Sequence, residues 1–66
     1  MPIKRAAMKL KALREKRGMT QGELAAKAKL SREYVLRLEG ARQDPTLSTL
    51  EALAKALGVP VTELLE

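Results

Sequence analysis

Residues 20–39 read TQGELAAKAKLSREYVLRLE and carry the signals of two short helices joined by a tight turn. Thr20 and Glu23 form a Thr-x-x-Glu capping box, a specific start signal for a helix. Residues 29–30 make the turn, and Ser31 is a natural N-cap for the second helix. Apolar and small residues follow with helical spacing at Leu24, Ala25, Ala28, Leu30, Val35 and Leu38. This pattern predicts a helix-turn-helix, in which one helix is free to enter the major groove of DNA.

The residues before this stretch predict a helix of their own. Pro2 suits its first turn, and residues 1–8 form its basic N-terminal extension. Gly18 is expected to end this helix, because glycine readily adopts the left-handed conformation that follows a last turn. Its apolar repeat runs through Ile3, Ala6, Ala7, Leu10 and Leu13.

Two more helices are expected after the motif. Residues 40–44 read as a loop, after which Thr46 or Ser48 can cap a fourth helix, and Ser48 forms a second capping box with Glu51. The apolar stripe of that helix comprises Leu47, Leu50, Leu53, Ala54 and Leu57. After Gly58 a last short helix is expected to turn three residues inward, namely Val61, Leu64 and Leu65. The expected fold is a single all-α domain over residues 1–66, a compact five-helix bundle.

Composition excludes several kinds of site. The 66 residues contain no cysteine and no histidine, which removes disulfides, thiolate metal sites, the usual general base and most zinc sites. We therefore expect no enzyme activity, no metal and no cofactor, and no small-molecule ligand, because 66 residues leave no room for a ligand-sensing domain. No apolar run approaches the roughly 20 residues that a membrane span needs, so a cytoplasmic protein is expected.

The net charge of +5 is unevenly distributed. Residues 1–17 carry one acidic side chain, Glu15, and seven basic ones: Lys4, Arg5, Lys9, Lys11, Arg14, Lys16 and Arg17. Residues 46–66 carry one basic side chain against three acidic ones. A basic front half indicates an anionic partner on one side, although a solvated lysine-rich surface would look the same.

Two charged residues interrupt apolar stripes. Arg14 lies in line with Leu10 on the first helix, and Glu39 follows Val35 by four residues on the third. Because either charge buried alone would cost several kcal/mol, the pattern predicts an Arg14–Glu39 salt bridge. The alternative is that both side chains reach solvent at the ends of their helices.

Nearly the whole chain resembles the phage-repressor helix-turn-helix family of the Cro and lambda-repressor (XRE) type. The matching segments are Leu13-Arg14, Thr20-Gln21-x-Glu23-Leu24-Ala25, Ser31-Arg32, Leu38-Glu39, Asp44-Pro45-Thr46 and Leu53-Ala54-Lys55-Ala56-Leu57-Gly58-Val59. The resemblance implies a bundle of four or five helices and an ion pair between the first helix and the end of the third. The chain departs from the family at Lys29 and Ala41, where the family favours glycine.

The third helix is expected to read DNA bases. Val35, Leu38 and part of Tyr34 face inward, which leaves an outward row of Arg32, Glu33, Leu36 and Arg37. The guanidinium group of each arginine can donate two hydrogen bonds, to guanine O6 and N7. Glu33 can accept a hydrogen bond from a cytosine amino group or orient one of the arginines. Leu36 suits a thymine methyl group, although a self-association contact or an ordinary exposed leucine is equally expected.

Phosphate contacts are expected from groups that frame this helix. Gln21 stands at the N-terminus of the second helix, where free N–H groups favour an anion, and the resemblance implies a phosphate contact for its side chain. The other candidates are Ser31, Tyr34, Arg42 and Gln43. Each of these side chains has an equally expected role as a cap or a solvated group.

The predicted function is a sequence-specific regulator of transcription, most simply a repressor, that binds double-stranded DNA. Such modules usually act as two-fold dimers, and the dimer surface is expected near the fifth helix, with Val59, Val61 and Leu65 as candidates. The alternative is the same fold used as a protein-interaction or antitoxin-like accessory module without specific DNA binding.

Overall fold

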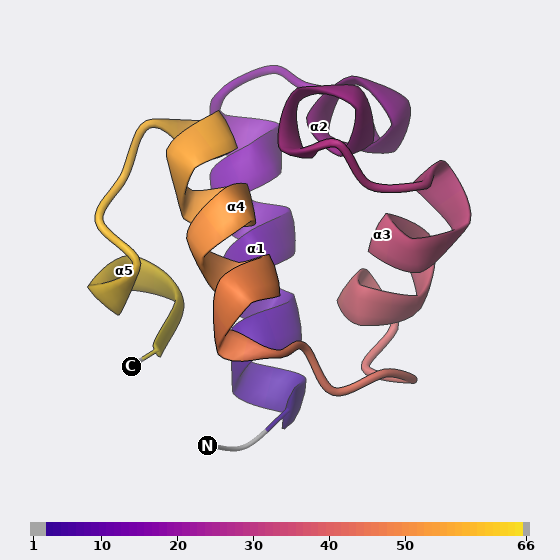
Figure 1. The fold of residues 1–66 in the computed structure, drawn as a ribbon, viewed down its shortest axis with the longest axis vertical. Helices are drawn as coiled ribbons and strands as arrows, with labels where there is room; N and C mark the ends of the chain where they lie inside the picture. Colours follow the sequence, from indigo (N-terminus) through magenta and orange to yellow (C-terminus); the bar gives the residue numbers. More distant parts are fainter. Residues whose placement is uncertain (1–2, 66) are drawn as a thin grey trace.

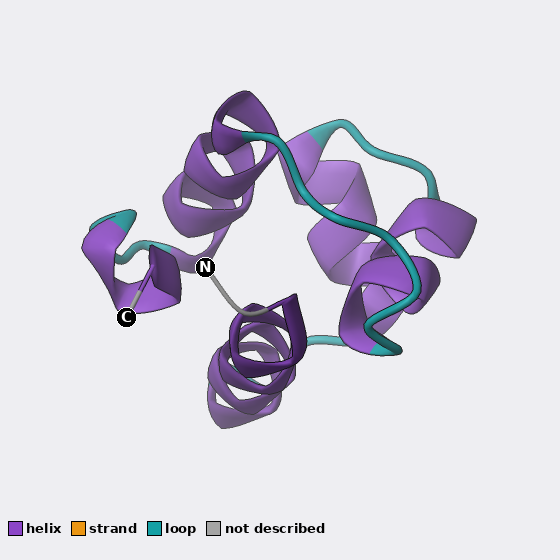
Figure 2. Ribbon diagram, turned by 90° about the horizontal axis from the view of Figure 1, so that it is seen from below, coloured by secondary structure: helices purple, strands orange, loops and turns teal. Residues whose placement is uncertain are grey.

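The computed structural model describes residues 3–65, with the side chain of Ile3 outside that description, and contains five α-helices. They are α1 (Ile3–Lys16), α2 (Gln21–Ala28), α3 (Arg32–Glu39), α4 (Leu47–Leu57) and α5 (Thr62–Leu65). α2 packs against α3 and α4, while α1 packs against α3 and α5 (Figure 1). The loop between α3 and α4 crosses the bottom of the molecule in Figure 1 and faces the viewer in Figure 2.

Side-chain caps fix where the central helices begin. Thr20 Oγ1 accepts from the Glu23 N–H at 3.0 Å, and Glu23 Oε1 accepts from the Thr20 N–H at 2.8 Å, which completes the predicted capping box. Ser31 Oγ accepts from the Tyr34 N–H in the first turn of α3, at 3.0 Å. These bonds satisfy N–H groups that the helices themselves leave unpaired.

The cap of α4 is Thr46, and the predicted capping box of Ser48 and Glu51 is wrong. Thr46 has an extended backbone, with ψ at 165°, and its Oγ1 accepts from the Thr49 N–H at 3.2 Å. Ser48 is therefore the second residue of α4 and not its N-cap.

Four helix ends share one geometry, in which a residue in the left-handed conformation follows the last turn. These residues are Gly18, Lys29, Ala41 and Gly58, with φ between 57° and 71°. At each end a later N–H bonds back to a carbonyl five residues earlier, as in Leu30 N–H to Ala25 O at 2.8 Å. The two positions at which the chain departs from the family's glycine thus do require a left-handed backbone.

Substituting Lys29 by glycine is expected to raise the free energy of unfolding by about 0.5–1 kcal/mol, because a left-handed conformation costs a residue with a Cβ about that much or more. Urea unfolding followed by circular dichroism measures the change. Lys27→Gly is the matched control, since Lys27 lies within α2 and should lose about 1 kcal/mol instead. Equal losses in both variants would contradict the strain.

The core collects apolar side chains from all five helices. Its fully buried members are Leu24, Val35, Leu53 and Leu64. Ala6 and Ala7 of α1 are also buried, so the described part of the basic extension is the first two turns of a core helix. Predictions for Pro2 and for the Ile3 side chain lie outside the described residues.

Two leucines that the apolar pattern assigned to the core lie at the surface. Leu47 is 58% exposed at the first position of α4, whereas Leu50 in the same turn is buried. Leu65 is 38% exposed, since it neighbours the fully buried Leu64 and adjacent helix positions point about 100° apart. Among the described residues, no helix is both long and apolar enough to cross a bilayer.

Candidate nucleic-acid interface

A buried ion pair joins α3 to α1. Arg14 Nε donates to Glu39 Oε2 at 2.6 Å and Arg14 Nη2 donates to Glu39 Oε1 at 3.0 Å. The predicted salt bridge is therefore present and bidentate. Both side chains are nearly inaccessible, at 10% and 3% exposure. The hydrogen bonds that Arg14 donates to Glu39 raise the pKa of Arg14 above its ordinary value, against the opposing effect of burial, so the guanidinium stays charged.

This pair also anchors the start of α2. Arg14 Nη1 donates to the carbonyl of Met19 at 2.7 Å, and Gln21 Nε2 donates to Glu39 Oε1 at 3.1 Å. One carboxylate therefore ties together the last residue of α3, the first of α2 and the end of α1. The orientation of α3 relative to α2 is fixed by these charged hydrogen bonds as well as by the core.

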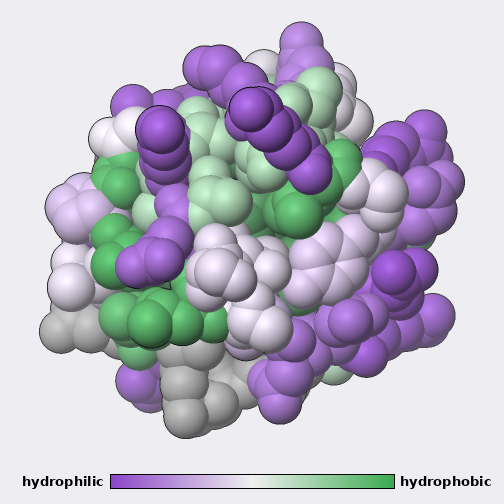
Figure 3. Space-filling model, in the orientation of Figure 1, coloured by the Kyte–Doolittle hydropathy of each residue, from purple (hydrophilic) through white to green (hydrophobic). Residues whose placement is uncertain are grey.

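α3 buries one face and presents the other to solvent. Val35 and Leu38 are buried and Tyr34 is half-buried. The four side chains predicted to read bases are all exposed, namely Arg32, Glu33, Leu36 and Arg37. Hydrophilic residues gather on the right of the molecule, over α3 (Figure 3). Leu36 is 51% exposed amid these polar groups.

Arg37 is held against the loop that follows α3. Its Nε donates to Gln43 Oε1 at 3.1 Å, and its guanidinium carbon lies 5.9 Å from the centre of the Tyr34 ring, within cation–π range. The Tyr34 hydroxyl in turn lies 3.4 Å from Thr49 Oγ1 on α4. Because only Nε is engaged, both terminal nitrogens of Arg37 remain able to donate to an external acceptor pair.

The predicted phosphate-contacting residues also border this face, and most retain free donors. Ser31 Oγ accepts from the Tyr34 N–H, which leaves the hydroxyl hydrogen to donate. Gln21 keeps one amide hydrogen after bonding to Glu39, and Gln43 keeps both after accepting from Arg37. Arg42 is exposed in the loop. Tyr34 is half-buried, and its hydroxyl lies 3.4 Å from Thr49 Oγ1 on α4.

Comparison with known proteins gives the family. Residues 10–64 match the helix-turn-helix family HTH_3, which is the XRE or Cro type. The chain belongs to this helix-turn-helix family.

Relatives within this helix-turn-helix family include repressors and regulators. The chain is 50% identical over 56 residues to the immunity repressor protein of Bacillus phage phi105, covering 85% of this chain and 39% of that protein. It is 46% identical over 52 residues to the uncharacterized HTH-type transcriptional regulator y4dJ of Sinorhizobium fredii, covering 79% of this chain and 68% of that protein. The chain thus spans well under half of the phage repressor's length.

Solved structures of regulators have the same fold. The hypothetical transcription factor NHTF from Neisseria superimposes with a TM-score of 0.95 at 35% identity, covering 100% of this chain and 76% of that one. The restriction-modification controller protein C.AhdI from Aeromonas hydrophila gives a TM-score of 0.92 at 31% identity, covering 94% of both chains. These matches confirm the predicted five-helix, helix-turn-helix fold.

Three contacts around the helix-turn-helix motif were not predicted from the sequence. They are the Arg37–Gln43 bond, the Tyr34–Thr49 contact and the approach of Arg32 to α2, where a Cβ on Gly22 would lie 3.7 Å from Arg32 Cδ. Each depends on the path of the loop or on helix packing, for which the residue pattern carries no signal. Within the described residues, acidic side chains form no cluster of metal-ligand type.

Replacing Gln43 with alanine is expected to weaken binding to a specific DNA duplex about three- to tenfold, because Arg37 loses a hydrogen bond to a charged group and with it its fixed position. Fluorescence anisotropy with labelled duplex measures the effect. Gln43→Glu should retain the contact to Arg37 and separates positioning from charge. An unchanged affinity in Gln43→Ala would show that the hydrogen bond has no such role.

Proposed function

We propose that this chain is a sequence-specific, double-stranded DNA-binding regulator of transcription, and specifically a repressor, that inserts α3 into the major groove. The observation that carries this proposal is the outward row of side chains on α3, presented on a helix that the Arg14–Glu39 pair fixes to the rest of the domain. Membership of a family of DNA-binding transcriptional regulators supports it, and gives no reason to expect an enzyme.

Arg32 and Arg37 are the proposed readers of guanine. Each presents paired donors that match O6 and N7 in the major groove. Glu33 would accept from a cytosine amino group or orient a neighbouring arginine, and Leu36 would contact a thymine methyl group. The exposure of Leu36 supports this role, since an apolar side chain half in water gains by covering a methyl group.

Phosphate contacts on either side of the groove would set the register of α3. Gln21 would act through its side-chain amide and through the N–H groups at the start of α2, where the helix dipole favours an anion. The remaining proposed contacts are Ser31, Tyr34, Arg42 and Gln43. For Tyr34, contact with a phosphate requires the hydroxyl to turn from Thr49.

Two copies are proposed to bind DNA together through the surface around α5. Val59 and Val61 are partly buried against the core, and Leu65 is exposed. Figure 3 shows hydrophobic side chains on the left of the molecule, over α5 and its connection to α4. A pair of domains meeting there could place its two α3 helices in successive major grooves, about one helical turn apart.

Leu65→Glu is expected to reduce cooperative binding to a duplex with two half-sites at least about tenfold, because it places a charge in an apolar contact. Binding to a single half-site should stay unchanged and serves as the internal control. If both duplexes lose affinity equally, or neither does, the domains do not pair through α5.

Selection from a pool of random duplexes across a salt series tests the function itself. A dimeric regulator should enrich a palindromic sequence, and its affinity should fall steeply with salt as counterions are released from phosphates. Binding that enriches no sequence and disappears by physiological salt would leave only general charge attraction and overturn the proposal.

A further inference from the structure

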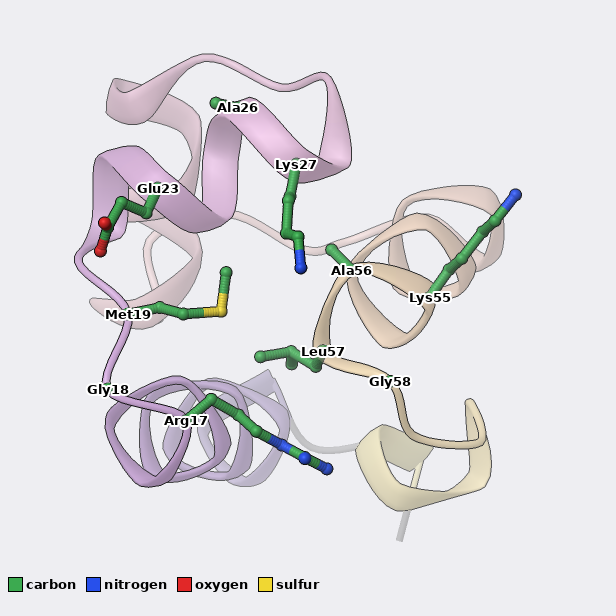
Figure 4. Close-up of a pocket in the computed structure, with 10 residues that line it drawn as sticks. All are labelled: Arg17, Gly18, Met19, Glu23, Ala26, Lys27, Lys55, Ala56, Leu57 and Gly58. Carbon is green, nitrogen blue, oxygen red and sulfur yellow. The ribbon is translucent and has the colours of Figure 1, made fainter.

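A broad hollow of about 890 Å³ opens away from α3, between the C-terminal ends of α1 and α4 and the outer side of α2. Its apolar floor includes Met19, Ala56 and Leu57, which Figure 4 shows around the middle of the opening. Met19 and Ala56 are partly buried, and Leu57 belongs to the core. Met19 and Ala56 therefore keep apolar surface that the fold leaves uncovered in the hollow, beside the buried Leu57.

A second hollow of about 420 Å³ continues the first along α2 and α4. The two share Lys27, Lys55 and Ala56, and the second extends to Lys29 and to the alanines Ala28 and Ala52. We call the two hollows together the α2–α4 furrow. No residue of α3 lines either hollow, so the furrow is separate from the proposed DNA-reading face.

The furrow is rimmed by positive charge. Four cationic side chains line it, namely Arg17, Lys27, Lys29 and Lys55. Its one acidic neighbour, Glu23, is already bonded to the Thr20 N–H at 2.8 Å and points away from the opening in Figure 4. Over residues 3–65 the ion pairs within 4.0 Å are those of Arg14, so none of these four cations is held in such a pair.

Figure 4 shows how two of these cations frame the apolar floor. The Lys27 side chain extends from α2 toward Leu57, and the Arg17 side chain runs along the opposite side of the opening. A ligand that fits must combine carboxylates for the rims with apolar side chains for the floor. A helix about 10 Å across has these properties when one face is acidic at its edges and apolar between them, whereas a DNA duplex is wider and offers no apolar ridge.

We propose that the α2–α4 furrow docks an acidic amphipathic helix of a partner protein. Its apolar residues cover Met19 and Ala56, and its carboxylates pair with Arg17 and Lys27. Helix-in-groove recognition of this kind relies on apolar anchors for affinity and on charge for orientation. Because the furrow lies apart from α3, the partner and DNA bind at the same time.

The test uses a synthetic amphipathic helix of Glu-Leu-Leu-Glu repeats and nuclear magnetic resonance of the labelled chain. Titration is expected to shift the amide signals of Met19, Lys27, Ala56 and Gly58 and to leave those of Arg32 and Arg37 in place. The double variant Arg17→Ala/Lys27→Ala should bind about tenfold more weakly, because two exposed ion pairs are lost. Both substituted side chains are exposed, and the spectrum of the free variant reports that it is folded.

Lys4→Ala/Lys11→Ala is the matched control, since it removes the same charge from exposed positions outside the furrow. An equal loss of peptide affinity in both double variants would show that the binding is general charge attraction, and would overturn the proposal. Equal binding of a Glu-Ser-Ser-Glu peptide, or shifts of the same amides by a short duplex, would assign the furrow to a polyanion instead. The peptide titration needs no DNA, so failure of the DNA-binding proposal would leave its outcome unaffected.

Discussion

Replacing Glu39 with alanine is expected to lower the free energy of unfolding by about 3–5 kcal/mol, because Arg14 would remain buried without its carboxylate. The Glu39 side chain is 3% exposed and accepts hydrogen bonds from both Arg14 and Gln21. A domain of this length has a total stability of roughly 3–10 kcal/mol, so a loss of this size removes a large fraction of it. Urea unfolding at 10 °C would measure the loss.

Glu15 provides the matched control for this prediction. Its carboxylate lies 4.0 Å from Arg14 but its side chain is 59% exposed, so Glu15→Ala should cost less than about 0.5 kcal/mol. Replacing both partners, as in Arg14→Met/Glu39→Met, should recover part of the loss, because no charge is then left buried. A loss below about 0.5 kcal/mol in Glu39→Ala would describe a solvent-screened pair and contradict the burial.

The second large effect is expected at Arg37. Substitution by alanine should weaken binding to the selected duplex by about 1–3 kcal/mol, or roughly five- to 150-fold, because a bidentate hydrogen-bonded contact to guanine is lost. The variant should also accept any base at one position of each half-site, since the side chain that distinguishes that base is gone. Repeating the selection with the variant and aligning the recovered sequences measures both changes.

Lys11→Ala controls for the loss of positive charge, because Lys11 is exposed on α1, away from α3. That variant should bind all sequences almost as well as the original chain and recover the same consensus. If Arg37→Ala weakens binding but recovers an unchanged consensus, Arg37 contacts the DNA backbone and does not read a base.

Most of the fold was predictable because its signals are local. The Thr20–Glu23 capping box, the Ser31 cap and the apolar repeats each lie within a few residues of the helix they define. The Arg14–Glu39 pair, although 25 residues apart, was predictable for a different reason. Each charge interrupts an apolar stripe, and two opposite buried charges satisfy each other at lower cost than either alone.

The features that could not be predicted from the sequence depend on the paths of the loops and on how the helices pack at the edge of the core. Leu47 follows the apolar repeat of α4, yet it is the first residue of the helix and lies exposed, while Leu50 three residues on is buried. The Arg37–Gln43 bond depends on how the loop after α3 folds back, which the left-handed Ala41 determines. The α2–α4 furrow arises from the spacing of three helices and has no counterpart in any single segment.

Interference by guanine methylation tests whether α3 reads bases in the major groove. Dimethyl sulfate places a methyl group on guanine N7, which lies in that groove and is the atom assigned to Arg32 and Arg37. We expect methylation to block binding at guanines in each half-site, and one of these positions to become insensitive in Arg37→Ala. Binding that tolerates N7 methylation throughout the selected duplex would contradict this expectation.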